Sequence, residues 1–304
     1  IVGLDICGVD LVCEDISRPL DEQRGAIVEV NAGPGLLMHL KPANGQPRPV
    51  GRAIVDELFP NGDDGRIPVV GVSGSSGKTA VARLLAGIVG LSGRTTGLAC
   101  SSGLFVGRRC IDPGDAANWG SANRILMNRT VETAIIENGC DSILDDGLAY
   151  DRCQVGIVTN VEPERHFGRH DVNTAEQVFT VLRTQVDVVL PGGAAVLNAS
   201  QPMLVDMASL CDGEVIFFAA DGDLPAIVEH RGRGGRAVFV RAGEVVFGSS
   251  EQDAVITSLR AIPLTDAGRS AVQVEHVLAA AAAAWALGIA PEIVRTALET
   301  ATID

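Results

Sequence analysis

A glycine-rich turn that ends in Gly-Lys-Thr is the stretch of this sequence whose residue types point most directly to chemistry. It runs Gly74-Ser75-Ser76-Gly77-Lys78-Thr79, follows the apolar run VVGVS and precedes a helical pattern. Amides in such a turn and at a helix start can bind phosphate, a lysine can reach the β and γ phosphates, and a threonine hydroxyl can ligate magnesium. The common P-loop pattern is not met, because Val72 stands where that pattern has its first glycine.

The elements that must position this turn alternate between apolar strands and helices from residue 67 onward. We expect strands at PVVGVS, TAIIE, QVGIVTNV, AAVLNA and VIFFA, and helices at 77–91, 174–187 and 272–287. Such alternation predicts a parallel sheet covered by helices. Residues 226–262 break the rhythm, because AIVEH, RAVFVR and EVVFG resemble short strands between glycine-rich turns. They predict a small antiparallel appendage.

The first sixty residues follow a different pattern. Two strand-like runs, GVDLVCEDI and GAIVEVNA, precede a helical stretch, RAIVDELF, and the charged turn PNGDDGR. We therefore divide the chain into domains 1–60 and 61–304. Glu29 and Asn31 share one face of their strand because side chains alternate with period two. Both can contact the same magnesium ion, and Asp10 on the neighbouring run is a further candidate ligand.

Composition narrows the classes of function. The 304 residues predict about two domains, and the 46% apolar content is ordinary for a globular core. A formal charge of −14 disfavours nucleic acid and anionic membranes as partners. The seven cysteines are odd in number, scattered and without Cys-x-x-Cys, which predicts reduced thiols, no zinc site and a cytoplasmic location. There is no signal-peptide pattern and no initiator methionine, so we expect a piece of a longer protein.

The glycine-rich turn resembles the Gly-Thr-Asn-Gly-Lys-Thr loop of the Mur ligases. Other segments resemble that family in the same order: TAIIE with Glu137, TNVEPERHFG with Asn160 and His166, AVLNASQP, and VEHVLAA with His276. Singly, each segment has an ordinary alternative, such as a solvated strand end or a satisfied loop histidine. Together they imply that Lys78 and His166 are catalytic and that Thr79 and Glu137 hold magnesium. The implied ATP-binding residues are Gly74, Ser75, Gly77, Lys78, Thr79, Asn160 and His276.

The first segment, with AIVEVNAGPGL, resembles the end of an ATP-grasp domain, where Asp10, Glu29 and Asn31 would hold Mg²⁺ beside the phosphates of ATP. An ATP-grasp end joined to a Mur-like loop resembles the cyanophycin synthetases, over nearly the whole chain. That resemblance implies an α/β fold: a fragment of an ATP-grasp domain, then a Mur ligase central-type P-loop parallel sheet with the antiparallel appendage. It also implies a homodimeric or homotetrameric ligase that activates carboxylates as acyl phosphates and builds the polymer cyanophycin from aspartate and arginine.

The Mur-like part departs from its family pattern at several positions. Ser76 replaces an asparagine, Arg165 stands where an aspartate precedes His166, Leu182 occupies the place of a lysine, and His276 that of an asparagine. VEPER is one residue longer than the family pattern, and because the sequence ends at ETATID we expect the closing C-terminal Mur domain to be absent. A cation at Arg165 opposes magnesium, and a guanidinium such as Arg183 cannot replace a carbamylated lysine. These departures indicate a degenerate nucleotide site.

We therefore favour the second type of cyanophycin synthetase, which polymerises β-Asp-Arg dipeptides with its ATP-grasp site alone. One alternative is the ordinary two-site enzyme, in which the Mur-like site still adds arginine. The other is a noncatalytic scaffold or assembly module. In each case we expect the fragment alone to be inactive, because it lacks the rest of the ATP-grasp domain and a Mur lid.

Overall fold

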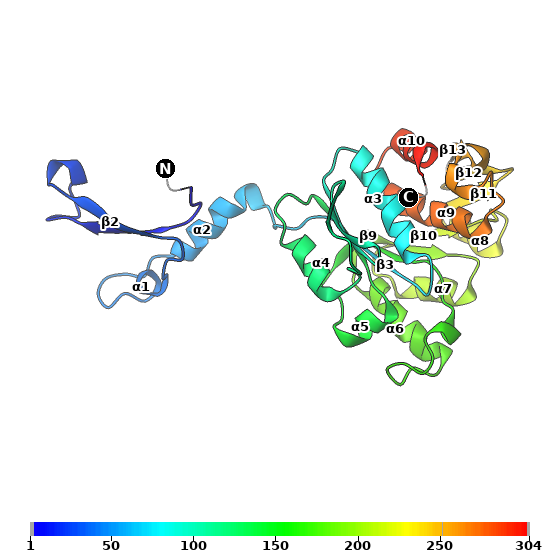
Figure 1. Cartoon of the computed structure of the whole chain (residues 1–304), viewed down its shortest axis with the longest axis horizontal. Coiled ribbons are helices and arrows are strands. Elements are labelled where there is room, and N and C mark those ends of the chain that lie inside the picture. Colours follow the sequence, from blue (N-terminus) through cyan, green and yellow to red (C-terminus); the bar gives the residue numbers. More distant parts are fainter. Residues whose placement is uncertain (1–2, 251, 303–304) are drawn as a thin grey trace. The chain divides into compact units, whose positions relative to one another are not determined.

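The computed structural model describes residues 3–250 and 252–302, and the backbone contacts divide the chain into two units, 1–66 and 67–304. In the first unit (Figure 1, blue), β1 (Gly8–Val12) pairs with β2 (Ala26–Asn31) in antiparallel register. The helices of this unit are η1 (Leu20–Glu22), α1 (Leu37–Leu40), α2 (Val50–Leu58) and η2 (Pro60–Gly62). Both expected strands and the expected helix are thus present, although β1 ends before CEDI.

One buried glutamine organises the loop between β1 and β2. The Nε2 of Gln23 donates to the carbonyl oxygens of Asp15 and Arg18, both at 2.7 Å. Its Oε1 accepts from the backbone N–H of Asp15, also at 2.7 Å. The amide therefore replaces the backbone pairing that the irregular chain between the strands cannot make for itself.

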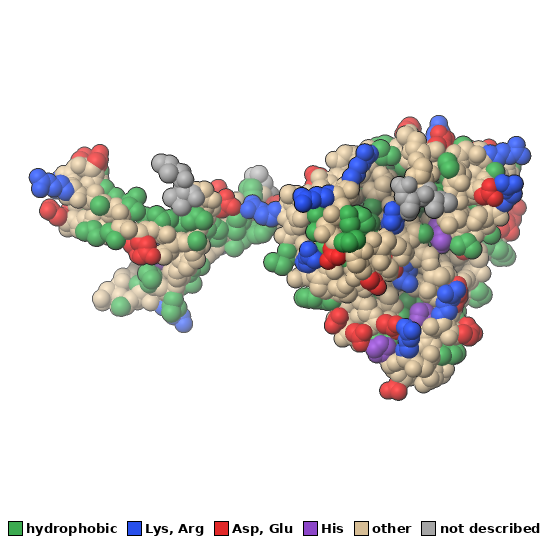
Figure 2. Space-filling model, in the orientation of Figure 1, with side chains coloured by type: hydrophobic (Ala, Val, Ile, Leu, Met, Phe, Trp, Pro, Cys, Tyr) green, Lys and Arg blue, Asp and Glu red, His purple; other side chains and the backbone are tan. Residues whose placement is uncertain are grey.

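The first unit exposes many of its large apolar side chains (Figure 2, green). Val12 is 63% exposed, Ile27 60% and Leu37 67%. No apolar side chain among the described residues of this unit is buried. A two-stranded sheet with short helices lacks the apolar core that independent stability requires.

The second unit is built on one sheet, which has eleven strands in the described residues. The parallel strands, in spatial order, are β4 (Thr96–Cys100), β7 (Thr133–Glu137), β3 (Val69–Ser73), β8 (Cys153–Val158), β9 (Val189–Asn198), β10 (Glu214–Ala219) and β11 (Arg236–Arg241). Antiparallel strands extend both edges: β5 (Gly103–Val106) and β6 (Arg109–Asp112) beside β4, and β12 (Glu244–Gly248) and β13 (Asp253–Ser258) beside β11. The α/β fold with a mostly parallel sheet is confirmed.

Two details differ from the sequence-based expectation. AIVEH lies in a helix, α8 (Pro225–Gly232), and is not a strand. Proline is well accommodated in the first turn of a helix, where its missing N–H has no intrahelical partner to lose. RAVFVR and EVVFG do form strands, but β11 pairs in parallel with β10. The antiparallel strands therefore continue the main sheet.

Helices cover both faces of this sheet (Figure 1). Buried residues of α3 (Lys78–Leu91), α9 (Ala271–Ala286) and α10 (Pro291–Thr300) form one apolar cluster with one face. The opposite face packs against α4 (Trp119–Leu126), α6 (Ala175–Asp187), α7 (Pro202–Met207) and α8. The remaining helical segments are α5 (Cys140–Asp145), η3 (Pro163–Arg165), η4 (Ala208–Leu210), η5 (Leu259–Ala261) and η6 (Pro263–Thr265). The alanine run of α9 is a buried core helix, as expected, and no helix in the described part of the chain is long and apolar enough to cross a membrane.

A buried cluster of polar side chains packs against the central strand β3. The Nδ2 of Asn138 donates to the Tyr150 hydroxyl at 2.7 Å and to the Oε1 of Gln185 at 2.9 Å. A Cβ atom at Gly71 would come within 2.1 Å of the Tyr150 oxygen. The close packing of β3 against this cluster therefore requires glycine at position 71. The cluster fixes the position of the strand just before the glycine-rich turn begins.

Candidate functional site

The turn Gly74–Thr79 leads from the carboxyl end of β3 into α3, and its backbone needs glycine at two places. Gly74 has a φ of 132° and Gly77 a φ of 77°. A Cβ at Gly74 would lie 2.1 Å from the Oγ1 of Thr159, and one at Gly77 would lie 2.2 Å from the Nε2 of His276. The turn thus approaches the end of β8 and the helix α9 more closely than any side chain allows.

The segment after β8 braces the turn from one side. The amide of Ser75 donates to the carbonyl oxygen of Asn160 at 3.0 Å, and the amide of Ser76 donates to the Asn160 side-chain oxygen at 2.9 Å. The Thr159 hydroxyl donates to the Ser76 carbonyl oxygen at 2.7 Å. Asn160, expected at the nucleotide, thus also shapes the loop. The amides at the start of α3 have no intrahelical partner and stay suited to an anion.

Thr79 and Glu137 meet as the resemblance implied. The Thr79 hydroxyl donates to the carboxylate of Glu137 at 2.9 Å. The amide and the hydroxyl of Ser101 donate to the same carboxylate at 2.9 and 3.0 Å. Glu137 is only 3% exposed, so these donors take the place of the water that would otherwise solvate its carboxylate. A hydroxyl and a carboxylate are oxygen donors of the kind that Mg²⁺ accepts together with phosphate, and the pair therefore fits a magnesium ion beside the loop. Sequence reasoning missed Ser101.

Lys78 and His166 are close enough for the lysine charge to act on the imidazole. In the described part of the chain the Lys78 ammonium has no hydrogen bond or ion pair, which leaves it available to an anion. The Nε2 of His166 lies 2.9 Å from the Ser75 hydroxyl. Burial lowers the pKa of His166, and the nearby charge of Lys78 lowers it further. The imidazole is therefore neutral at pH 7.

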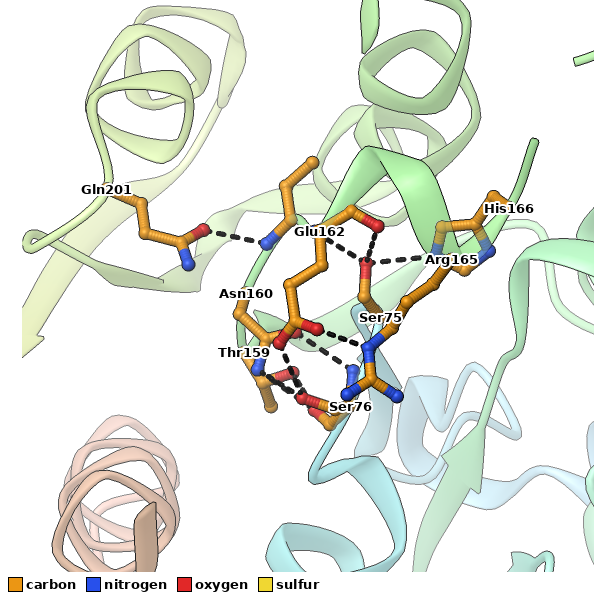
Figure 3. A network of polar contacts seen from close by, with 9 residues as sticks. Ser75, Ser76, Thr159, Asn160, Glu162, Arg165, His166 and Gln201 are labelled. Carbon is orange, nitrogen blue, oxygen red and sulfur yellow. Dashed lines mark hydrogen bonds and ion pairs between the residues drawn. The ribbon is translucent and has the colours of Figure 1, made fainter. Parts of the chain in front are cut away.

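The two loop serines also contact Glu162, which sequence reasoning did not single out: Ser76 binds its carboxylate and Ser75 its backbone (Figure 3). The Ser76 hydroxyl donates to the Oε1 of Glu162 at 3.1 Å, and the amide of Glu162 donates to the Ser75 hydroxyl at 2.8 Å. The other carboxylate oxygen of Glu162 forms an ion pair with Arg165. Arg165 thus has a carboxylate partner three residues earlier in the chain. The spacing of Glu162 and Arg165 in VEPER could have indicated this ion pair from the sequence.

The side of the turn that faces His276, one of the implied ATP-binding residues, has only a small cavity. A cavity of about 10 Å³, lined in part by Phe218, Glu275 and His276, lies there. Such a volume holds about one water molecule. His276 packs against Gly77, and burial lowers its pKa. Burial also disfavours the charged form of the neighbouring Glu275, and therefore raises its pKa.

The candidate metal residues of the first unit come together through strand pairing. Asp10 of β1 is directly opposite Glu29 of β2, and Asn31 is opposite Gly8. Directly opposed side chains have Cβ atoms about 5 Å apart, and two like charges in that position are unfavourable without a cation. No three His, Cys, Asp or Glu side chains among the described residues cluster as metal ligands. The face offers two carboxylates and one amide, a set that suits Mg²⁺ when phosphates and water complete the shell.

The parallel sheet, the glycine-rich turn and the Thr79–Glu137 pair define the class of protein. The chain belongs to the Mur ligase middle domain family, which it matches over residues 72–250. It is also 39% identical to a cyanophycin synthetase from Synechocystis sp. over 302 residues, which are 99% of this chain and 34% of that protein. The chain thus spans about a third of the length of the cyanophycin synthetases that it matches.

Solved structures show the same fold. A UDP-N-acetylmuramoyl-L-alanyl-D-glutamate–2,6-diaminopimelate ligase superposes with a TM-score of 0.59 at 14% identity, covering 87% of this chain and 53% of the other. MurF from Acinetobacter baumannii superposes with a TM-score of 0.54 at 18% identity, covering 83% of this chain and 49% of the other. The individual site residues and the ATP-grasp assignment of residues 1–60 remain predictions.

Proposed function

We propose that this chain is a segment of an ATP- and magnesium-dependent carboxylate–amine ligase of the cyanophycin synthetase type. The similarity over 99% of the chain to such a synthetase supports this proposal. In the proposed reaction a polymer carboxylate takes the γ-phosphoryl group of ATP and ADP leaves. An incoming amine then attacks the acyl carbon, phosphate leaves, and the nitrogen loses a proton. The substrates would be cyanophycin with aspartate and arginine, or the Asp-Arg dipeptide.

The first unit would supply the metal-binding face of an ATP-grasp site. Asp10, Glu29 and Asn31 would hold Mg²⁺, which supplies charge neutralisation at the phosphates during phosphoryl transfer. The opposed carboxylates of Asp10 and Glu29 support this role. The exposed apolar side chains of the unit support its being the end of a larger domain.

We further propose that the Mur-like unit is a degenerate scaffold and that the ligase polymerises β-Asp-Arg dipeptides. The single observation that carries this finer proposal is the engagement of the loop serines by Glu162. The water-sized cavity beside His276 agrees with it. A homodimeric or homotetrameric cytoplasmic enzyme is the expected setting, with the Mur-like unit as a candidate contact between subunits.

Substrate choice tests this proposal. The longer ligase that contains this segment is incubated with ATP, Mg²⁺ and either β-Asp-Arg or free aspartate plus arginine, and polymer is quantified. We expect polymer from the dipeptide and none from the free amino acids. Efficient polymer formation from the free amino acids would contradict the dipeptide assignment.

The ordinary two-site enzyme is the second candidate, and specific observations favour it. Thr79 still meets Glu137 at 2.9 Å, and Lys78 has no partner in the described residues. An active second site of this kind would attach arginine, and Lys78→Ala would abolish arginine incorporation while chain extension by aspartate continued.

A further inference from the structure

We propose that Glu162 acts as a resident anion of the Gly74–Thr79 turn and weakens the binding of polyphosphate there. This inference rests on the proposed function, in which the Mur-like unit is degenerate, and it assigns weaker binding of phosphate at the turn to one side chain. The carboxylate holds Ser76 and Arg165 in an arrangement that an incoming phosphate must open.

The polar groups of Ser76 are all engaged by residues that follow β8. Its amide donates to the Asn160 side chain at 2.9 Å, and its carbonyl oxygen accepts from Thr159 at 2.7 Å. Its hydroxyl accepts from the Nδ2 of Asn160 at 3.0 Å and donates to Glu162 at 3.1 Å. The bond to Glu162 is the one that uses the hydroxyl hydrogen. Ser76 can therefore donate this hydrogen to a phosphate only after Glu162 has released it.

The charges around the turn show why a carboxylate at position 162 opposes the binding of an anion more than a neutral side chain would. Lys78 is the loop cation, His166 is kept neutral by burial, and Arg169 is paired with Asp141 at 2.5 Å. Arg165, which could otherwise face a phosphate, is paired with Glu162. An entering anion therefore meets the negative charge of Glu162 and finds Arg165 already neutralised.

The carboxylate can move away without unfolding the segment. The Glu162 and Arg165 side chains are 38% and 60% exposed, and ion pairs with this exposure contribute little stability. The backbone is held independently, since the amide of Glu162 donates to Ser75 at 2.8 Å and the amide of Val161 donates to Gln201 at 2.7 Å (Figure 3). Changing only the charge of Glu162 should therefore leave the turn in place.

Calorimetric titration of the 304-residue chain with MgATP, and separately with inorganic tripolyphosphate, tests the proposal. Glu162→Gln keeps the size of the side chain and an acceptor for Ser76 but removes the charge. We expect it to bind both ligands about tenfold more tightly than the wild type, which corresponds to about 1.4 kcal/mol. Glu164→Gln is the matched control, because Glu164 is exposed and has no ion pair in the described part of the chain. It should bind like the wild type.

Several outcomes would overturn the proposal. These are equal affinity of Glu162→Gln and wild type, weaker binding by the variant, no binding by either, or an equal gain in Glu164→Gln. Circular dichroism checks that each variant is folded, and Glu162→Ala serves if Glu162→Gln is not. In the double variant Glu162→Gln, Arg165→Gln the gain should shrink, since the released Arg165 contributes to it. Because these titrations need no polymer synthesis, their failure is distinct from a failure of the proposed ligase activity.

Discussion

The hydroxyl of Thr79 lies 2.9 Å from the carboxylate of Glu137, although 58 residues separate them in the chain. Parallel pairing of β3 with β7 sets Val72 opposite Glu137. The carboxyl ends of these strands therefore meet at the edge where α3 begins. The fold thus brings together the two residues of the second unit that are proposed to hold magnesium.

Replacing Thr79 by valine should destabilise the chain measurably. The variant keeps the shape of the side chain but removes a hydrogen bond to a buried carboxylate, so we expect a loss of about 1–2 kcal/mol in the free energy of unfolding. Denaturant titration measures this change. Thr180→Val is the control, because the Thr180 hydroxyl donates only to a carbonyl oxygen within an exposed part of its helix. Equal effects of the two substitutions would contradict the account of Thr79.

Two glycine substitutions near the turn should act in opposite directions. Gly74→Ala places a Cβ 2.1 Å from the Thr159 hydroxyl at a φ of 132°, and should lower stability by more than about 2 kcal/mol. Gly87→Ala lies within α3 with no atom within 4 Å of the new Cβ. It should raise stability by about 0.5–1 kcal/mol. A neutral Gly74→Ala would show that the turn has a different backbone conformation.

Stability should fall as the pH is lowered from 7 to 5.5. Burial lowers the pKa values of His166, His230 and His276 from their ordinary 6.5. Between 6.5 and the lowered folded values the unfolded chain binds more protons, so acid favours unfolding. The raised pKa of Glu275 makes the folded state more stable as the pH falls toward its ordinary 4.5. We expect the effect of the three histidines to exceed the effect of this single carboxyl group.

Thermal unfolding at several pH values measures this dependence. His276→Asn should make the fall smaller, because it removes one of the three contributing groups. Stability that is constant or increases on acidification would contradict the burial of these imidazoles.

Local sequence patterns sufficed for the elements around the turn. PVVGVS became β3, the helix expected at 77–91 became α3, and TAIIE became β7. Each is a run in which apolar spacing and flanking glycines agree. AIVEH failed because five residues are too few to distinguish a helix from a strand by periodicity. That the antiparallel strands continue the main sheet depends on strand order, which local pattern does not encode.

The candidate site was predictable only in part, because contacts between residues far apart in the chain are not encoded in local pattern. Glycine, lysine and threonine spacing indicated the loop, and Thr79 and Glu137 do meet. The role proposed for Glu162 depends on its contact with Ser76, 86 residues earlier. Nothing in the composition of VEPER predicts that contact. The opposition of Asp10 and Glu29 likewise required the register of two strands.

The most direct test of the central claim compares two variants of the longer ligase that contains this segment. Glu29→Gln removes a proposed magnesium ligand of the ATP-grasp site, and Lys78→Ala removes the free cation of the Mur-like turn. Polymer formation from β-Asp-Arg, ATP and Mg²⁺ is measured for both. We expect Glu29→Gln to lose about a hundredfold or more in rate and Lys78→Ala to retain the wild-type rate. Loss of polymerisation in Lys78→Ala with normal activity in Glu29→Gln would contradict the account.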